Sequence, residues 1–241
     1  MKIALAEASS LTGDIKANLQ TLHKFVIRSK ENDTDALFFG EAFLQGFDSL
    51  TFDFRQDTAI TKTLDCPELY FISRLAHDKQ LAIGLGFYRR DHDAIHSSYI
   101  VFGHNGETLA LYDRISSGWK IKEADSHYQN GKELVSFSLQ GKTFGIGLCG
   151  DGFSASFLKK AERAHFTYFV WPVYLNFNEK EWQKELPSYQ ENAARLGEET
   201  YLIGSLSPEP KSLGGAFVFK NQKVLCSIPL GEEGLLLKTI Q

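Results

Sequence analysis

A stretch near the middle of the chain, residues 143–151 (Thr-Phe-Gly-Ile-Gly-Leu-Cys-Gly-Asp), constrains the fold more than any other. Its large apolar residues, Phe144, Ile146 and Leu148, alternate with small ones. This pattern is typical of a strand that packs tightly on both faces, as the strands of an α/β sheet do. The stretch therefore predicts a buried strand that ends at Cys149.

Cys149 lies at the carboxyl end of this predicted strand, where α/β sheets place their chemistry. Residues 150–151 turn the chain toward a helix that we predict to begin near Phe153. The first N–H groups of such a helix would point at the sulfur and favour the thiolate. The alternative is that Cys149 is a small buried hydrophobe, which is the commoner fate of a free cysteine.

The composition is that of an ordinary soluble globular protein. The 241 residues carry a formal net charge of −4 and no run of Lys and Arg, so no nucleic-acid footprint is visible. No segment has the length of a membrane span, and the N-terminus lacks the apolar core of a signal peptide. The three cysteines, Cys66, Cys149 and Cys226, lie far apart, which predicts reduced thiols in the cytoplasm. No Cys/His cluster has zinc spacing.

A second candidate for chemistry is Glu41, the charge that follows the apolar run of residues 36–39. Residues 42–44 beyond it are apolar again, so the carboxylate is expected to lose solvation. Burial of this kind raises the pKa of a carboxyl group toward the range that suits a general base. From its position alone, a surface glutamate at the end of a strand is the favoured interpretation of Glu41.

The rest of the chain alternates predicted strands with about four predicted helices. Asp14 is a plausible cap for the first helix, and residues 179–197 are helical in pattern, with a break or fresh start predicted at Pro187. Asn-Gly within residues 104–106, between two strand-like runs, is a strong hairpin signal. This mixture predicts a single α/β domain with mixed sheets over residues 1–241.

One segment, residues 116–131, is polar and irregular. Loops in compact domains are seldom this long unless they are functional. The segment contains Trp119, Lys120, Glu123 and Tyr128, which are candidates for the site. A loop rich in Lys and Glu is often only a solvated flap, and this alternative stays open.

Taken together and in order, several segments resemble the carbon–nitrogen hydrolase (nitrilase) superfamily. Residues 38–47 are similar to its strand-end glutamate motif, with Gly40 in place of the usual Pro. Residues 147–151 are similar to its nucleophile strand, where an aromatic residue usually follows the Cys and Gly150 stands here. Further similar segments lie at residues 83–86, 104–112, 171–172, 214–218 and 223–225.

The resemblance implies a four-layer α-β-β-α sandwich with two mixed sheets and a Glu–Lys–Cys triad, in which Glu41 and Cys149 match directly. The family's lysine normally stands two residues after a Tyr, and Arg114 occupies that place here. A guanidinium cannot shuttle a proton, although it can stabilise an oxyanion. Lys120 is the other candidate for the cation and is slightly preferred. Glu123 is the best candidate for a second glutamate of this loop, and Asp125 is its fallback.

The resemblance also implies covalent catalysis without a metal or an organic cofactor. Glu41 would take the proton of Cys149, and the thiolate would attack the carbonyl carbon of the substrate. The cation and a backbone N–H just after Cys149 would hold the oxyanion, and Glu41 would then protonate the leaving amine. Six residues that follow strand ends or lie in the long loop are expected near the substrate, although each could be core or rim: Phe43, Trp119, Tyr128, Trp171, Tyr174 and Asn176.

The leading functional hypothesis is therefore a cytoplasmic amidase that acts on a small carboxamide or N-carbamoyl compound, with water as the second reactant. No nucleic acid or membrane is expected as a partner, and the resemblance implies a homodimer. A nitrilase acting on a nitrile ranks lower because it is the rarer activity. A non-catalytic relative that keeps the fold for binding or assembly is a different class of function, and Arg114 favours that alternative.

Overall fold

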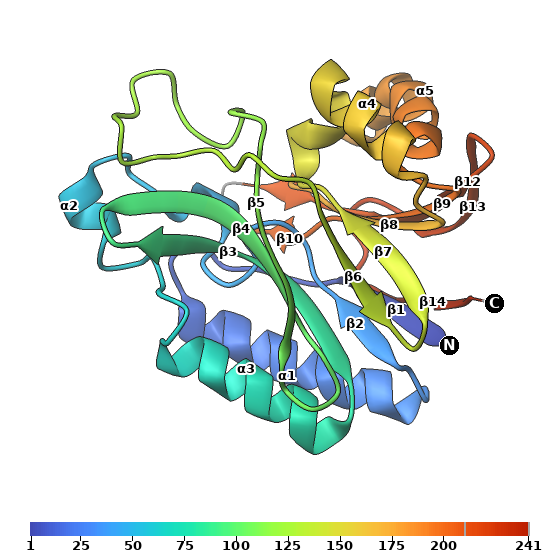
Figure 1. Cartoon of the computed structure of the whole chain (residues 1–241), viewed down its shortest axis with the longest axis horizontal. Coiled ribbons are helices and arrows are strands. Elements are labelled where there is room, and N and C mark those ends of the chain that lie inside the picture. The colour runs from blue at the N-terminus through green and yellow to red at the C-terminus, as the bar shows by residue number, and fades with distance from the viewer. Residues whose placement is uncertain (210, 241) are drawn as a thin grey trace.

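The computed structural model describes residues 1–209 and 211–240, and over these residues two six-stranded mixed sheets form (Figure 1). The first sheet has, in spatial order, β14 (Gly234–Thr239), β1 (Lys2–Glu7), β2 (Ala36–Phe38), β3 (Ala82–Asp91), β4 (Ala94–Phe102) and β5 (Thr108–Asp113). The second has β13 (Lys223–Ile228), β12 (Ala216–Lys220), β9 (Glu199–Ile203), β8 (Tyr168–Pro172), β7 (Lys142–Ile146) and β6 (Val135–Leu139). The short strands β10 (Leu206–Ser207) and β11 (Ser212–Leu213) pair with each other.

Helices cover the outer face of each sheet, which gives four layers (Figure 1). The first sheet is covered by α1 (Ile15–Glu31) and α3 (Pro67–Lys79), and the second by α4 (Ala155–Ala164) and α5 (Glu179–Leu196). Shorter turns are η1 (Phe47–Ser49), α2 (Phe54–Asp57) and η2 (Cys149–Phe153). The predicted α-β-β-α sandwich with two mixed sheets is confirmed. Among the described residues, no helix is long and apolar enough to cross a bilayer.

The helices follow the apolar spacing of the sequence. The Asp14 side chain accepts a hydrogen bond from the backbone N–H of Ala17 at 2.9 Å, so the predicted cap of α1 is confirmed. In contrast, α5 continues through Pro187, and the predicted break there is wrong. A proline inside a helix removes one backbone hydrogen bond. Trp182 and Tyr189 are buried on either side of it, and this packing keeps the helix continuous.

The two sheets meet through aromatic side chains. Phe38 at the end of β2 and Phe144 in β7 have ring centroids 6.3 Å apart, and Phe137 of β6 stacks on Phe144 at 5.1 Å. Strands β2 and β7 therefore face each other across the core. The chain leaves β2 toward Glu41 and leaves β7 toward Cys149, so this contact places both residues between the sheets.

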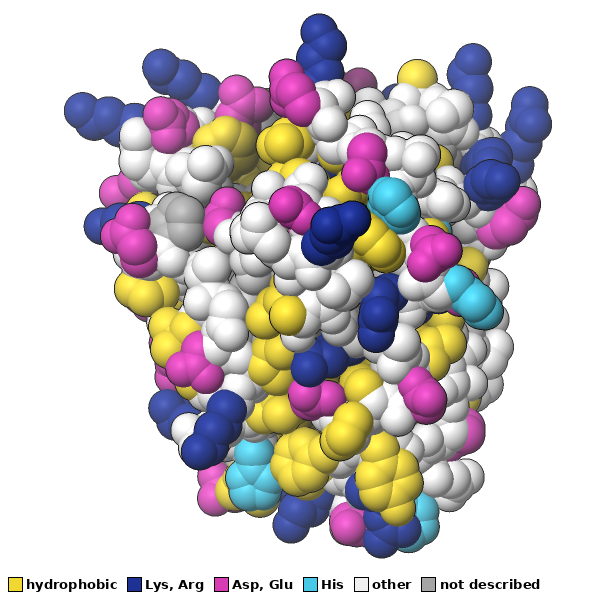
Figure 2. Space-filling view, turned by 90° about the vertical axis from the view of Figure 1, so that its left-hand side faces the viewer, with side chains coloured by type: hydrophobic (Ala, Val, Ile, Leu, Met, Phe, Trp, Pro, Cys, Tyr) yellow, Lys and Arg dark blue, Asp and Glu magenta, His cyan; other side chains and the backbone are white. Residues whose placement is uncertain are grey.

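The end of the molecule that carries α2 and the irregular segment 116–131 is shown in Figure 2. Acidic and basic side chains are interspersed on this face, with hydrophobic side chains gathered mainly in its lower half. No single sign of charge dominates the face that Figure 2 shows.

Glu7, the last residue of β1, is fully buried, and neither of its carboxylate oxygens has a hydrogen-bond partner of normal geometry. Burial raises the pKa of Glu7 well above its ordinary value, and the nearby backbone N–H of Gly215 offsets only part of this effect. The folded state therefore favours the neutral carboxylic acid.

Glu7→Gln is expected to stabilise the protein increasingly as pH rises. Because the pKa of Glu7 is higher in the folded than in the unfolded state, wild type loses stability once pH exceeds the unfolded value of about 4.3, until pH reaches the folded pKa. Glutamine does not titrate, so its advantage grows by up to about 1.4 kcal/mol per pH unit in this window. Urea unfolding at pH 4.5, 6 and 8 measures it. An equal difference at all three values would show that Glu7 is not protonated in the fold.

Candidate active site

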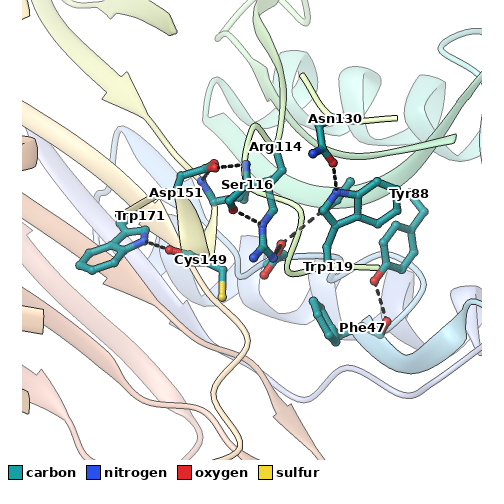
Figure 3. Close-up of polar contacts among 12 residues, drawn as sticks. Phe47, Tyr88, Arg114, Ser116, Trp119, Asn130, Cys149, Asp151 and Trp171 are labelled. Atoms are coloured by element: carbon teal, nitrogen blue, oxygen red, sulfur yellow. Dashed lines mark hydrogen bonds and ion pairs between the residues drawn. The ribbon is translucent and has the colours of Figure 1, made fainter. Parts of the chain in front are cut away.

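Cys149 is the first residue of η2, and β7 ends at Ile146, three residues before the strand end predicted from the sequence. Its φ is +41°, a left-handed conformation that is uncommon and strained for a residue with a side chain. The indole N–H of Trp171 donates a hydrogen bond to the Cys149 carbonyl at 2.8 Å and holds this conformation (Figure 3). The thiol side chain is half-buried.

Asp151 fixes the turn that carries Cys149. Its buried carboxylate accepts hydrogen bonds from the backbone N–H of Leu148 at 2.8 Å, the backbone N–H of Ser116 at 2.7 Å and the hydroxyl of Tyr112 at 2.6 Å. These donors come from the nucleophile strand, the irregular segment and β5. One carboxylate therefore joins the two sheets beside the thiol.

Glu41 lies just beyond β2 and is 1 % exposed. A Cβ atom on the preceding residue, Gly40, would lie 2.3 Å from the Ser205 hydroxyl, so only glycine fits between the strands there. Oε1 of Glu41 accepts hydrogen bonds from Nη1 of Arg114 at 2.7 Å and from the hydroxyl of Ser97 at 3.2 Å. Oε2 is buried and has no partner among the described residues. One carboxylate oxygen is thus held in place, and the other is unused.

Arg114 follows β5 and is 2 % exposed. Its guanidinium donates from Nε to the Ser116 hydroxyl at 2.9 Å (Figure 3). Nη1 donates to Glu41. Nη2 makes no hydrogen bond to another described residue. The charges of Glu41, Cys149 and Asp151 raise the pKa of Arg114 further above its already high value, so the guanidinium stays protonated.

The electrostatics of the site favour a neutral thiol at rest. Burial and the charge of Glu41 raise the pKa of Cys149 to about 11, although Arg114 and the backbone N–H of Tyr174 oppose the change. Burial also raises the pKa of Glu41, and Arg114 opposes it. The helix predicted to begin near Phe153 begins at Ala155 and is capped by Ser154, and the backbone N–H that acts on the Cys149 thiol is that of Tyr174.

The structure does not bring Lys120 and Glu123 to this cluster. The Lys120 ammonium donates a hydrogen bond to the carbonyl oxygen of Tyr128 and lies 5.6 Å from the ring centroid of Trp119. Glu123 is exposed, and so is Asp125, which pairs with the imidazole of His127 at 2.8 Å. Of the predicted catalytic residues, Glu41, Cys149 and Arg114 therefore lie together, while Lys120 and Glu123 lie in the irregular segment outside the cluster.

Three of the predicted substrate-binding residues are core residues in the structure. Phe43 is buried against Phe39 beneath the first sheet, with ring centroids 4.5 Å apart. Trp119 and Tyr128 are buried together, and Trp119 lies on the side of Arg114 away from Cys149 in Figure 3. The Tyr128 hydroxyl donates to Asp57 at 2.6 Å. The hydrogen bonds of Trp119 and Tyr128 hold the irregular segment in place.

The other three come from β8 and the segment after it. The indole N–H of Trp171 donates to the carbonyl oxygen of Cys149, as described above, and Asn176 is exposed. Tyr174 is half-buried, its ring stacks on Phe47 at 4.4 Å, and its hydroxyl donates to Asp48 at 2.7 Å. Trp171 through its indole N–H and Tyr174 through its backbone N–H therefore both contact Cys149.

Sequence reasoning did not single out several residues of the cluster. Ser97 and Ser116 touch Glu41 and Arg114, but nothing distinguishes them from other serines in the sequence. Tyr189 of α5 is 5 % exposed, interacts electrostatically with Cys149 and Glu41, and makes no hydrogen bond to a described residue through its hydroxyl. No group of three His, Cys, Asp or Glu among the described residues could hold a metal ion.

The profile of the Carbon-nitrogen hydrolase family matches residues 2–197. Because this match spans well over half of the chain, the chain belongs to the carbon–nitrogen hydrolase family. The family predicted from the sequence is thus confirmed. The prediction of a carbon–nitrogen hydrolase is confirmed at the level of the family.

Two curated proteins are similar over part of their length. A glutamine-dependent NAD(+) synthetase of Thermotoga maritima is 23 % identical over 155 residues, which are 63 % of this chain and 26 % of that protein. An arylacetonitrilase of Hypocrea virens is 22 % identical over 114 residues, which are 44 % of this chain and 35 % of that protein. The match thus spans about a third or less of each relative.

Solved structures share the fold. An amidase from Nesterenkonia sp. AN1 superposes with a TM-score of 0.83 at 17 % identity, covering 100 % of this chain and 93 % of that one. That structure is of a variant in which acrylamide has added to the active-site cysteine. A glutamine-dependent NAD+ synthetase from Acinetobacter baumannii has a TM-score of 0.78 at 18 % identity, covering 98 % of this chain and 44 % of that one. At these identities the likeness shows the fold.

Proposed function

We propose that this chain is an amidase that hydrolyses a small carboxamide through a thioester on Cys149. The observation that carries the proposal is the state of Glu41. Its Oε1 is held by Arg114 and Ser97, while its Oε2 is buried and unpaired among the described residues. A fixed carboxylate with one free oxygen, next to a thiol that is neutral at rest, is suited to take the thiol proton as a general base.

In this mechanism Oε2 of Glu41 accepts the proton of Cys149 as the sulfur attacks the amide carbon. The carbonyl oxygen becomes an oxyanion, which Arg114 stabilises through Nη2, the arm that makes no other hydrogen bond to a described residue. Glu41 returns the proton to the leaving nitrogen, so ammonia or an amine departs and a thioester remains. Glu41 then takes a proton from water, whose oxygen replaces the sulfur, and the acid is released with the thiol restored.

Arg114 as the cation favours an amide over a nitrile as substrate. Attack on an amide places negative charge on oxygen, which a permanent cation stabilises without giving up a proton. Attack on a nitrile places the negative charge on nitrogen, which must then be protonated. A guanidinium is too weak an acid to supply that proton. Of the four similar proteins, two are glutamine-dependent synthetases and one is an amidase, which agrees with an amide group as the reacting bond, while the fourth is named for a nitrile.

Ammonia release tests the proposed function directly. We expect release from at least one small carboxamide in a panel that includes glutamine, acrylamide and N-carbamoyl amino acids, and none from the matched nitriles. Cys149→Ala is the control for contaminating activity. Release from nitriles alone would overturn the choice of amide. A folded protein that binds amides without releasing ammonia would favour the non-catalytic alternative.

Lys120→Ala and Glu123→Ala are expected to keep kcat within about threefold of wild type, because neither side chain contacts Glu41, Arg114 or Cys149. Thermal unfolding is measured alongside, since the Lys120 hydrogen bond to the Tyr128 carbonyl holds the irregular segment. A loss in kcat of more than about 100-fold in Lys120→Ala, without a loss of fold, would assign the triad cation to Lys120.

Three further features predicted from the sequence stay predictions. These are the homodimer, the cytoplasmic location and the single domain over residues 1–241. The oligomeric state is measured by analytical ultracentrifugation of the purified chain.

A further inference from the structure

The guanidinium of Arg114 is held on two of its three nitrogens, with Nη1 on Glu41 and Nε on Ser116. These two contacts fix the plane of the fork, and the position of Nη2 follows from them. A lysine in the same place would have one nitrogen and no branch. The site must therefore contain space for an Nη2 arm that a lysine would not need.

Two glycines border that space. A Cβ atom on Gly150, the residue after the nucleophile, would lie 2.7 Å from Nη2 of Arg114. A Cβ atom on Gly118, in the irregular segment, would lie 3.1 Å from the same nitrogen. The first distance is shorter than real Cβ contacts allow, and the second is tighter than most of them. Any side chain at residue 150 would thus displace the Nη2 arm.

Neither glycine is required by its own backbone. The positive φ angles that favour glycine occur at other positions, such as Gly46 at +82° and Gly141 at +74°, and not at Gly118 or Gly150. Alanine fits the backbone at both sites, so the reason for a missing side chain lies in the neighbouring guanidinium. The Ser116 hydroxyl would lie 3.1 Å from a Cβ atom on Gly150 and closes another side of the space.

We propose that Gly118 and Gly150 form a slot that seats the guanidinium of Arg114 in the position of the triad cation. The arginine at position 114 and the glycine after Cys149 are then one coupled adaptation. The missing side chain at residue 150 makes room for the branch that a lysine lacks. The proposal rests on the proposed function for the role of Arg114, and it makes the two glycines positioning residues that act through that side chain.

The slot has a consequence for Cys149 that can be measured without a substrate. Arg114 lowers the pKa of the Cys149 thiol, against burial and the charge of Glu41. If a methyl group at residue 150 pushes the guanidinium away, the thiol titrates at higher pH and reacts more slowly with an alkylating agent. If residue 114 is lysine, the same methyl group meets no Nη2 arm.

The test is a double-mutant cycle on the full chain with Gly150→Ala, Arg114→Lys and both together. The readout is the rate of Cys149 alkylation by iodoacetamide between pH 7 and 11, with the modified peptide identified by mass. We expect Gly150→Ala to slow alkylation at pH 8 by roughly fivefold or more beside Arg114, and by less than about twofold in the Arg114→Lys background. Gly234→Ala, at a glycine of β14 that also lacks a positive φ, is the matched control and is expected to change neither rate.

Equal effects of Gly150→Ala in both backgrounds, or no effect beside Arg114, would overturn the slot. If Gly150→Ala fails to fold in the chain with Arg114 but folds in the chain with Arg114→Lys, the result would support the slot. If that variant unfolds in both backgrounds, Gly118→Ala decides by the same comparison, because its contact is looser. A chain that hydrolyses no amide can still pass this test, and an active amidase can still fail it. The two proposals therefore fall separately.

Discussion

Glu41→Gln is expected to abolish amide hydrolysis while making Cys149 more reactive toward iodoacetamide. Glutamine keeps the shape of the side chain but cannot take a proton, so kcat should fall by at least about 10²- to 10⁴-fold. The charge of Glu41 is one cause of the raised pKa of Cys149, about 11, and Arg114 lowers it. Removing the carboxylate charge and freeing Arg114 from its ion pair therefore both act to lower the thiol pKa.

The size of the alkylation effect follows from the chemistry of thiols. Well below its pKa, a thiol gains about tenfold in thiolate for each unit by which that pKa falls, and part of this gain is lost to weaker nucleophilicity. The net increase at pH 8 is roughly threefold per unit. Ser97→Ala, which leaves the carboxylate in place, is the matched control and should shift the alkylation profile far less. Slower alkylation in Glu41→Gln, or retained ammonia release, would contradict this assignment of Glu41.

Arg114→Met is expected to destabilise the fold strongly at neutral and alkaline pH, and to abolish activity. Glu41 and Arg114 form an ion pair at 2.7 Å in which both side chains are at most 2 % exposed. Removing one partner of a buried pair costs about 3–5 kcal/mol, because the other charge is left uncompensated. Methionine has a similar volume and lacks the charge, so the effect isolates the loss of the ion pair.

The pH dependence of this loss has a definite sign. Burial already raises the pKa of Glu41, and loss of Arg114 removes the main influence that lowers it. The neutral acid is then favoured in the folded variant, so stability falls as pH rises above the unfolded value of about 4.3. Urea unfolding at pH 5 and pH 8 should show a larger deficit at pH 8. The Glu41→Gln/Arg114→Met variant should recover much of it, and no recovery would contradict a buried ion pair.

The strand ends that carry the site could be predicted because local patterns determine them. One apolar run is followed by Gly40 and then Glu41, and another ends at Cys149, just before Gly150. These strand ends indicate the two site residues, and the order of the motifs indicates the fold. The cation could not be chosen in this way. Arg114 and Lys120 lie six positions apart in the sequence. Only the tertiary structure shows that one side chain reaches Glu41 and the other reaches the carbonyl of Tyr128.

Aromatic residues near a strand end are equally ambiguous in the sequence. Phe43 follows Glu41 closely, yet the chain turns it into the core under α1 and α3. The helix predicted to begin near Phe153 begins at Ala155, because the tight turn η2 occupies residues 149–153 and Ser154 provides the cap. The space beside the guanidinium of Arg114 depends on how close Gly118 and Gly150 lie to it, and no local sequence pattern encodes these distances.

The most direct test of the central claim is the mass of the protein quenched in acid during turnover of a carboxamide that releases ammonia. A Cys149 nucleophile predicts a fraction of chains heavier by the acyl group, with the added mass on the peptide that contains Cys149. The adduct should be absent from Cys149→Ala and should disappear when the amide is exhausted. Steady ammonia release without any adduct on Cys149, or an adduct on Cys66 or Cys226 instead, would contradict it.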